Sequence, residues 1–254
     1  MIKSYAKVNI FLKIIGVRGA YHEIISRFVR VDNLYDEMEF VQKPFHARGF
    51  ELKGGFQCKT LKNTIYKAYI LLKHAAKSTK MNDFFAEYAL NVKKNIPTGG
   101  GLGGGSSNAA AFLLHVNKIL ELGFSMQELC NIGSKIGADV NFFLHECKAA
   151  NVKGVGEIIE PLDDAPNIEL VFDDTACDTA LVYGKFKEYC HFYSDKTIAE
   201  KIASLSSQEI LQKFDNWFLN DLLRSVLICY PSLKAKADAG LFLSGSGSTF
   251  FKAG

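Results

Sequence analysis

The sequence predicts a mixed α+β fold. Segments with strand patterns and segments with helical patterns alternate along the chain. The strand pattern at residues 87–93 alternates apolar and polar side chains, which is typical of a half-buried strand in an antiparallel or mixed sheet. A length of 254 residues allows one large domain or two modest ones, and a hydrophobic content of 48% is that of a globular protein.

Four elements are predicted within residues 8–77. Strands are expected at residues 8–15, where Gly16 ends the pattern, at 24–31 and at 36–41. A helix is expected at 63–77, because apolar residues recur there at helical spacing. These residues are Ile65, Ala68, Tyr69, Leu72 and Ala76.

Two more helices are predicted immediately after a glycine-rich stretch. The first covers residues 106–122, and Gly123 is placed to end it. The second begins at Ser125, where Ser125 and Glu128 have the spacing of a capping box, and ends near Ile136.

The last third of the chain predicts short strands and helices. A strand is expected at 168–172, helices at 196–213 and 216–229, and a strand–turn–strand unit at 241–251. The second helix should stop before Pro231. Residues 160–166 contain two prolines and two aspartates, so domains are expected at 1–160 and 161–254.

The strongest functional signal is the glycine-rich stretch Pro97-Thr98-Gly99-Gly100-Gly101-Leu102-Gly103-Gly104-Gly105-Ser106-Ser107. Glycine lets a backbone approach a ligand closely, and at Gly104 we expect a side chain to disfavour a positive φ angle. The stretch runs directly into an apolar helix, which a flexible linker does not do. A helix N-terminus favours negative charge, so the stretch predicts a phosphate-binding loop.

Three common kinds of phosphate loop do not fit this stretch. A Walker A loop needs lysine after its last glycine, and Ser106 stands there. A dinucleotide-binding fingerprint follows a fully buried strand, whereas residues 87–93 predict a half-buried one. A protein-kinase loop would require later H-R-D and D-F-G motifs, and the sequence has neither.

The stretch resembles the second motif of the GHMP kinase superfamily, Pro-x-Gly-Gly-Gly-Leu-Gly-Gly-Gly-Ser-Ser. Four further motifs appear in the order typical of that superfamily: Ala6-Lys7-Val8-Asn9, Gly19-Ala20-Tyr21-His22, Gly137-Ala138-Asp139-Val140 and Leu243-Ser244-Gly245-Ser246-Gly247-Ser248. The resemblance implies a two-lobed α+β fold. Residues 1–160 would form the nucleotide-binding N-terminal lobe with S5-like βα topology, and 161–254 a ferredoxin-like C-terminal lobe.

The Ala-Lys-x-Asn start and the Tyr-His pair are similar to one branch of the superfamily. That branch implies an ATP-dependent kinase of isoprenoid precursor biosynthesis, acting on the 2-hydroxyl of a cytidine diphosphate-linked methylerythritol. Mg²⁺ is expected as the counter-charge of ATP, bound by Ser106 or Ser107, or mainly by phosphates and water. The alternatives are another GHMP small-molecule kinase, such as a mevalonate or homoserine kinase, and a nucleotide-sensing module without catalysis.

Two charged residues are candidates for catalysis, Lys7 and Asp139. Asp139 precedes an apolar helical run, so residue chemistry alone favours a helix-capping aspartate. Lys7 lies within a strand pattern, where a solvated lysine is the ordinary outcome. The resemblance instead implies that Asp139 is the catalytic base and that Lys7 stabilises charge on the acceptor oxygen.

The resemblance also implies binding residues. Tyr21, His22 and Tyr183 would hold the cytosine ring and Asn9 the erythritol part, although half-buried aromatic residues are common in any fold. The nucleotide would be bound by Asn63, Lys94, Asn95, Pro97, Gly99, Gly100, Gly101, Leu102, Gly103, Gly104, Gly105, Ser106 and Ser107. No acidic residue stands out as a metal ligand.

Charge and composition exclude several other classes. A net charge of +3 is too small for a nucleic-acid-binding surface, and no apolar run is long enough to predict a membrane span. The first residues lack a signal-peptide pattern, so a cytoplasmic location is expected. The six cysteines contain no C-x-x-C pair and are expected to be buried free thiols. The sequence does not indicate an oligomeric state.

Overall fold

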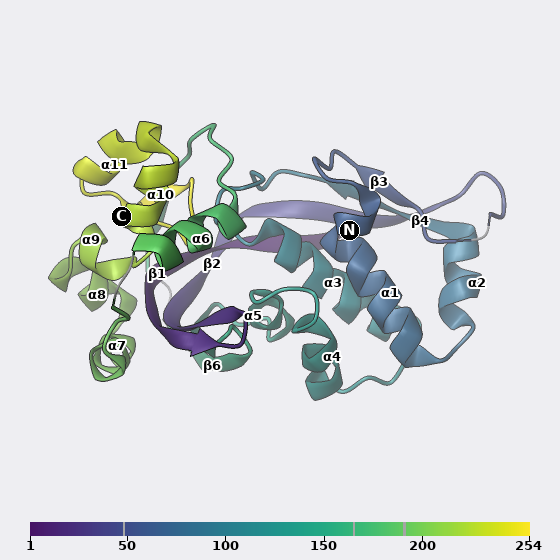
Figure 1. The fold of residues 1–254 in the computed structure, drawn as a ribbon. Helices are drawn as coiled ribbons and strands as arrows, with labels where there is room; N and C mark the ends of the chain where they lie inside the picture. The colour runs from purple at the N-terminus through teal and green to yellow at the C-terminus, as the bar shows by residue number, and fades with distance from the viewer. Residues whose placement is uncertain (48, 165, 190–191) are drawn as a thin grey trace. The chain divides into compact units, whose positions relative to one another are not determined.

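The structure is a computed structural model that describes residues 1–47, 49–164, 166–189 and 192–254. Its internal contacts group the chain into two compact units (Figure 1). The first unit contains Met1–Ala6, Val31–Ile96 and Gly104–Glu146, and the second contains Lys7–Arg30, Pro97–Gly103 and Cys147–Gly254. A domain boundary after residue 160 stays a prediction.

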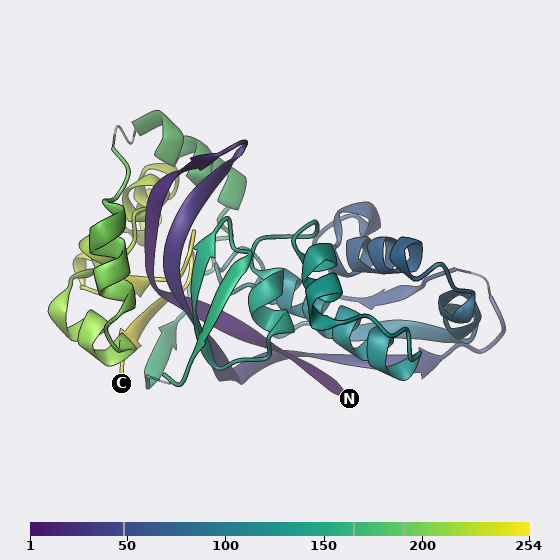
Figure 2. The same ribbon diagram turned by 90° about the horizontal axis from the view of Figure 1, so that it is seen from below.

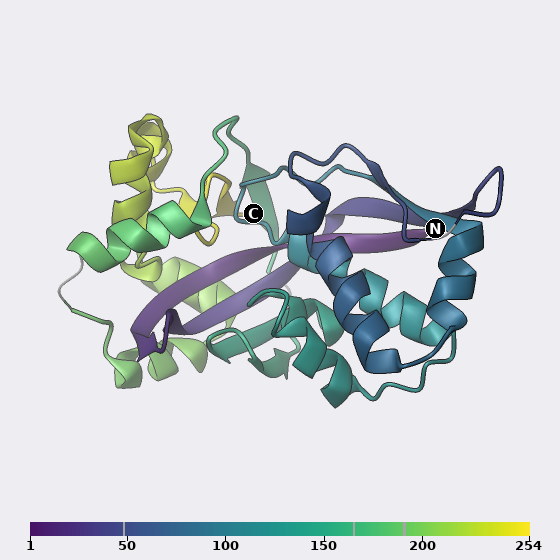
Figure 3. The same cartoon turned by 45° about the vertical axis from the view of Figure 1, so that its right-hand side comes forward.

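The first unit combines a small part of a sheet with a group of helices. The second half of β2 (Tyr21–Gln42) pairs antiparallel with β4 (Tyr88–Lys93), and β3 (Leu52–Gly54) pairs parallel with β4. The helical elements are η1 (Thr60–Lys62), α1 (Thr64–Ala76), α2 (Lys80–Glu87), α3 (Gly104–Ile119), α4 (Met126–Gly133) and α5 (Val140–Leu144). Helix α3 packs against α1, α4 and α5, and Figure 3 shows α1 among these helices.

The second unit contains two sheets. The first half of β2 pairs antiparallel with β5 (Ala149–Gly154), which pairs antiparallel with β6 (Ile158–Leu162). Strand β1 (Ile2–Arg18) pairs with β2, and Figure 2 shows these two strands beside β5 and β6. The other sheet has the antiparallel order β7 (Ile168–Val171), β9 (Phe250–Ala253), β8 (Phe242–Leu243).

Helices of the second unit pack around its apolar core. They are α6 (Thr179–Tyr189), α7 (Lys196–Ala203), α8 (Ser207–Lys213), α9 (Asn216–Leu219), α10 (Leu223–Cys229), η2 (Pro231–Leu233) and α11 (Lys234–Asp238). Helix α6 packs against α10, and the buried core includes Ile14, Val182, Val226 and Phe250. This core fixes the position of α6, which carries one of the predicted substrate residues.

The predicted α+β class is confirmed, and so are several local predictions. The helix expected at 63–77 is α1, and the structure shows that Asn63 caps it by accepting a hydrogen bond from the Ile65 N–H at 2.9 Å. Ser125 and Glu128 form the predicted capping box of α4. The last helix before Pro231 ends at Cys229, as expected.

Four predicted boundaries are wrong. The expected strands at 24–31 and 36–41 form one continuous strand, β2, and β1 continues past Gly16 to Arg18. The expected helix at 196–213 is divided by a second capping box, in which Ser206 caps α8. The expected helix at 216–229 is divided at Asn220, whose side-chain amide donates to the carbonyls of Leu243 and Gly245, each at 2.9 Å.

The described cysteines are free, but the expectation that they are buried is wrong for Cys58, which is exposed. Cys190 lies outside the described residues. Burial raises the pKa of the Cys177 thiol to about 12, so this thiol stays protonated at neutral pH. Within the described ranges, no helix is long and apolar enough to cross a bilayer.

Candidate active site

The glycine loop of the second unit, residues 97–103, requires glycine at specific positions. Gly99, Gly101 and Gly103 have φ angles of 75°, 72° and 68°, a region that L side chains rarely adopt. A Cβ on Gly101 would lie 2.1 Å from the carbonyl oxygen of Ser244, and one on Gly99 would lie 3.0 Å from Ala176. The loop therefore has both the conformation and the close packing that only glycine permits.

Each carbonyl oxygen from residue 99 to residue 102 accepts a hydrogen bond from elsewhere in the second unit. The donors, at 2.9–3.1 Å, are the backbone N–H groups of Lys7, Cys177, Ser248 and Thr249, the Lys7 ammonium and the Ser244 hydroxyl. The acceptor groups of the loop are thus turned toward the protein.

Lys7 is buried, so the expectation of a solvated lysine on a strand face is wrong. Its side chain donates to Asn9 Oδ1 at 2.6 Å and to the Gly101 carbonyl at 2.9 Å. The ammonium also lies 4.7 Å from the centre of the Phe28 ring, within the range of a cation–π contact. A buried ammonium is costly unless it is hydrogen-bonded, and these contacts fix it against the glycine loop.

Asn9 fixes the position of Lys7. While its oxygen accepts from Lys7, its amide donates to Ser26 Oγ at 3.0 Å, and its backbone N–H donates to Ser244 Oγ at 3.3 Å. A Cβ on Gly245 would lie 3.2 Å from Asn9 Oδ1 and 3.5 Å from Lys7 Nζ. The second glycine turn near the C-terminus therefore packs directly on this pair.

In the first unit, the first turn of α3 packs tightly against its neighbours. Gly104 does not have a positive φ angle, so that expectation is wrong; its constraint is the space left by Ile96, whose Cγ2 would lie 2.9 Å from an added Cβ. Thr64 Oγ1 donates to the Gly105 carbonyl at 2.6 Å. The Ser106 hydroxyl would lie 3.6 Å from a Cβ on Gly137, whereas Ser107 is buried.

Asp139 stands at the N-cap of α5, in the place that the sequence predicted. Its side chain makes no capping hydrogen bond, and its backbone is helical with φ −82° and ψ −8°. Residue chemistry alone favoured a helix-capping role for Asp139. The half-buried carboxylate does not perform that role. Helix α3 packs against α5. Gly137, in the segment before Asp139, therefore lies next to Ser106.

The predicted nucleotide residues Lys94 and Asn95 are held by a buried carboxylate, Asp36. Lys94 forms an ion pair with Asp36, and the Asn95 N–H donates to Asp36 Oδ1 at 2.7 Å. The Lys94 ammonium is therefore directed into the first unit. Asn63, the third predicted residue outside the glycine loop, is 5% exposed and uses its side chain to cap α1.

The predicted cytosine residues His22 and Tyr183 lie together in the second unit. Their ring centres are 5.2 Å apart with the planes inclined by 32°, and Phe186 meets His22 edge-on at 5.6 Å. His22 Nε2 is buried without a hydrogen-bond partner among the described residues. Burial, with a smaller effect of Lys187, lowers the pKa of His22. Tyr21 is 68% exposed.

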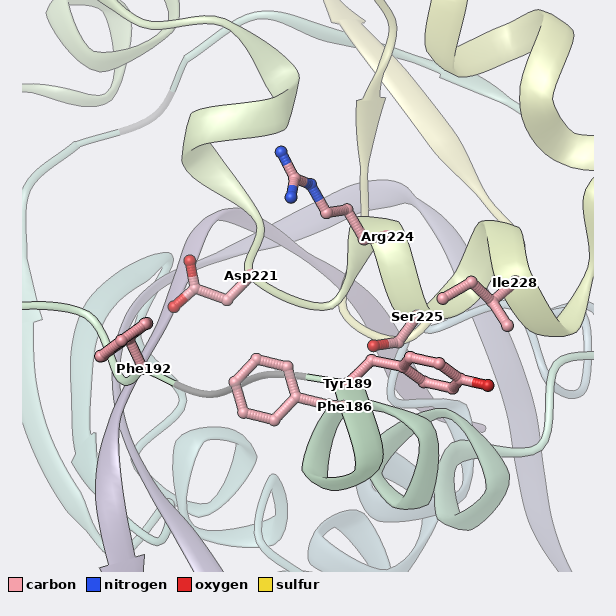
Figure 4. A pocket seen from close by; sticks show the side chains of 7 residues that line it. All are labelled: Phe186, Tyr189, Phe192, Asp221, Arg224, Ser225 and Ile228. Carbon is pink, nitrogen blue, oxygen red and sulfur yellow. The ribbon is translucent and has the colours of Figure 1, made fainter.

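A cavity of about 440 Å³ borders this aromatic cluster at Phe186. Figure 4 shows its lining: Phe186, Tyr189, Phe192, Asp221, Arg224, Ser225 and Ile228. The Asp221 carboxylate accepts hydrogen bonds from the Lys13 ammonium at 2.7 Å and from the Ile14 N–H at 2.7 Å, and these bonds join the turn between α9 and α10 to β1. None of the predicted site residues lines this cavity.

Sequence reasoning missed several residues that support the predicted ones: Ser26, Asp36, Thr64, Asn108, Phe186 and Ser244. Ser26 gave a signal in the sequence, because Ser26 and Arg27 interrupt the apolar run of β2. The structure shows that both side chains are almost fully buried. The contacts of Asp36 and Ser244 join residues far apart in the sequence, so no local pattern could have indicated them.

Comparison with known proteins agrees with the motifs. Residues 63–146 match the model of the GHMP kinases N terminal domain. The chain is 43% identical to the 4-diphosphocytidyl-2-C-methyl-D-erythritol kinase of Sulfurimonas denitrificans, over 99% of this chain and 96% of that protein. It is 41% identical to the kinase of the same name from Campylobacter jejuni subsp. doylei, over 99% of both chains.

A solved structure extends the similarity to the fold. A crystal structure of 4-(cytidine 5'-diphospho)-2C-methyl-D-erythritol kinase superposes with a TM-score of 0.73 at 27% identity, covering 99% of this chain and 88% of that one. The identities to the curated relatives exceed 40% over nearly the whole chain. The chain therefore belongs to the 4-diphosphocytidyl-2-C-methyl-D-erythritol kinase family of the GHMP kinases.

Proposed function

We propose that this protein is an ATP-dependent kinase that phosphorylates the 2-hydroxyl of 4-diphosphocytidyl-2-C-methyl-D-erythritol, in non-mevalonate isoprenoid precursor biosynthesis. The observation that carries the proposal is the glycine loop, whose positive φ angles and closely packed Cβ positions suit a backbone that approaches phosphates. Action in the cytoplasm, without nucleic-acid or membrane partners, is part of the proposal.

The loop would bind ATP through its N–H groups. Its carbonyl oxygens at residues 99–102 are turned toward the protein, and the first N–H groups of α3, which begins at Gly104, have no intrahelical acceptor. These groups and the helix dipole favour the charge of a triphosphate. Lys94 would contribute through its stem or backbone, because its ammonium is engaged by Asp36.

Mg²⁺ would accompany ATP and neutralise phosphate charge. Its donor set would be the Ser106 hydroxyl, phosphate oxygens and water. Ser106 suits this role better than Ser107, because Ser107 is buried while Ser106 lies beside Gly137 at the segment that leads to Asp139.

Lys7 and Asp139 would act on the transferred group. The acceptor oxygen bonds to the γ-phosphorus as the bond from that phosphorus to the β–γ bridging oxygen breaks, and ADP leaves. Asp139 would accept or orient the proton of the hydroxyl. Lys7, held rigidly by Asn9 and Gly101, would stabilise negative charge at the acceptor oxygen.

The acceptor would be recognised through its cytosine. His22 offers a buried nitrogen without a hydrogen-bond partner in the part of the chain that the structure describes, and a base edge can supply one. Tyr183 lies against the same ring, and Tyr21 is exposed enough to close over a base. Stacking of this kind stabilises a bound base by roughly 1–3 kcal/mol.

The reaction itself tests the proposal. ADP formation should be measured with the cytidine diphosphate methylerythritol, with mevalonate and with homoserine as alternative acceptors. Phosphorus NMR should find a new monoester beside the intact diphosphate only with the cytidine compound. Turnover of mevalonate or homoserine alone would contradict the proposed substrate, and ATP binding without any turnover would favour a nucleotide-sensing module.

Replacing His22 or Tyr183 by alanine is expected to raise the KM for the cytidine acceptor and leave the KM for ATP unchanged. The expected loss is about 1–3 kcal/mol of binding free energy for each ring. Steady-state kinetics with each substrate varied in turn measure both values. Equal increases in the two KM values would show that these rings support the fold and not the acceptor.

The lowered pKa of His22 predicts the pH dependence of acceptor binding. Because burial pushes this pKa below the ordinary value of 6.5, the ring stays neutral at pH 7. The KM for the acceptor should be constant down to about pH 6.5 and rise only at lower pH, where the ring takes up a proton. A rise that begins above pH 7, or one that persists in His22→Gln, would exclude His22 as its cause.

A further inference from the structure

Asp36 is a fully buried carboxylate that no motif singled out. It lies on β2 with an exposed fraction of 0%. Burial of a charged carboxylate is costly unless charge and hydrogen-bond partners compensate for the lost water. The contacts of Asp36 must therefore compensate for the free-energy cost of burying its charge.

Both oxygens of Asp36 are bound by the segment that enters the glycine loop and by the helix that follows it. Oδ1 accepts the backbone N–H groups of Asn95 at 2.7 Å and Ile96 at 2.8 Å. Oδ2 accepts the side-chain amide of Asn108 at 2.9 Å and forms the ion pair with Lys94. One carboxylate thus connects β2, residues 94–96 and α3.

The other members of this cluster are also bound to one another. Lys94 Nζ donates to Asn108 Oδ1 at 3.0 Å, and Asn108 Nδ2 also donates to Ser4 Oγ at 2.6 Å. Asn108 is buried, and the Lys94 side chain is only 16% exposed. The charge of Lys94 is therefore compensated inside the first unit.

This cluster lies directly against the first turn of α3. A Cβ on Gly104, the first residue of the helix, would lie 2.9 Å from Ile96 Cγ2 and 3.5 Å from Lys94 Nζ. Ile96 is held by Asp36 through its N–H, and Lys94 through its ammonium. The first turn of α3, whose N–H groups have no intrahelical acceptor, is thus placed by Asp36 and its partners.

We infer that Asp36 is a positioning residue for nucleotide binding: it holds the entry of the glycine loop and the first turns of α3 in the arrangement that binds the phosphates of ATP. The inference rests on the proposed function only in taking the nucleotide as the ligand of this helix end. Asp36 acts through Lys94, Asn95, Ile96 and Asn108. When the groups that orient a substrate are misplaced by about 1 Å, the reaction rate can fall roughly a hundredfold.

The test is the substitution Asp36→Asn, studied with both substrates. The amide keeps one acceptor oxygen but removes the negative charge and presents an N–H group to Asn108 or to the loop. We expect the KM for ATP, and the Kd of a non-hydrolysable ATP analogue, to rise roughly ten- to a hundredfold. The Kd of cytidine diphosphate, which probes the acceptor side, should change less than about twofold.

The matched control is Asp164→Asn in the second unit. Asp164 accepts from the buried Arg27 at 2.6 Å and from the Ser207 hydroxyl at 2.6 Å, so the substitution damages a buried ion pair of the same chemistry. It should lower the melting temperature without changing the ratio of the two affinities. The variant Asn108→Ala removes the hydrogen bonds of Asn108 to Asp36, Lys94 and Ser4 but leaves the Asp36 charge paired with Lys94. It tests the inference if Asp36→Asn does not fold.

The selective loss of ATP affinity in Asp36→Asn or Asn108→Ala supports the inference. Equal changes in both affinities, or a lowered melting temperature with ATP affinity unchanged, would overturn it and leave Asp36 with a role in folding only. These results are independent of the acceptor, because the ATP analogue is measured by binding. Failure of the wild-type protein to bind the analogue would instead contradict the proposed function.

Discussion

Replacing Asp139 or Lys7 by alanine is expected to lower kcat by about a hundred- to a thousandfold and to change either KM far less. Groups that act mainly in the transition state affect turnover, and the loss of one such group costs about 3–4 kcal/mol. If both act on the same transition state, the double variant should lose much less than the product of the two effects. Steady-state ADP formation with both substrates saturating measures kcat.

Asp195 provides a matched control for Asp139. Asp195 caps α7 by accepting from the N–H groups of Thr197 at 2.7 Å and Ile198 at 3.1 Å, whereas the Asp139 side chain makes no capping bond. Asp195→Ala should therefore lower the melting temperature and leave kcat unchanged. The opposite pattern is expected for Asp139→Ala. A kcat near that of the wild type in Asp139→Ala would leave this residue without a catalytic role.

The features that the sequence predicted well depend on neighbouring residues. The capping box of α4 involves only Ser125 and Glu128. The position of the glycine loop before α3 follows from glycine content and from the apolar helix after it. Such signals lie within one helical turn, so a single sequence displays them.

The features that were mispredicted depend on distant contacts. Lys7 was expected to be solvated, yet its ammonium is held by Gly101, 94 positions further along the chain. The break between α9 and α10 coincides with Asn220, whose side chain bonds carbonyls 23 and 25 positions away. Local helical propensity could not reveal either contact, because tertiary hydrogen bonds outweigh it.

Candidate site residues divide in the same way. Motifs placed Lys7, Asn9, His22 and the glycine loop, but the residues that orient them came only from the structure. Ser244 Oγ, for example, donates to the Gly101 carbonyl at 3.1 Å across 143 positions. The partners of Asp36 lie 58 to 72 positions after it. A carboxylate in a strand pattern carries no local sign of such contacts.

Gly101→Ala is expected to damage both stability and catalysis, because Gly101 has a positive φ angle and no space for a Cβ. An alanine at φ 72° is strained, and its Cβ would lie 2.1 Å from the Ser244 carbonyl oxygen, so the backbone must move. Strain of this kind costs about 1–3 kcal/mol, which lowers the melting temperature by roughly 2–10 °C in a chain of this size.

The catalytic loss follows from the same movement of the Gly101 backbone. The carbonyl of Gly101 accepts from the Lys7 ammonium, so its displacement should move Lys7 and lower kcat by roughly tenfold or more. Gly184→Ala is the control, since Gly184 lies within α6 and a Cβ there meets nothing within 4 Å. Alanine favours a helix, so that variant should keep or slightly raise the melting temperature. Thermal denaturation followed by circular dichroism, with kcat measured on the same samples, compares the two variants. A Gly101→Ala protein that melts and turns over like the wild type would mean that the loop does not require the close approach to Ser244 and does not position Lys7.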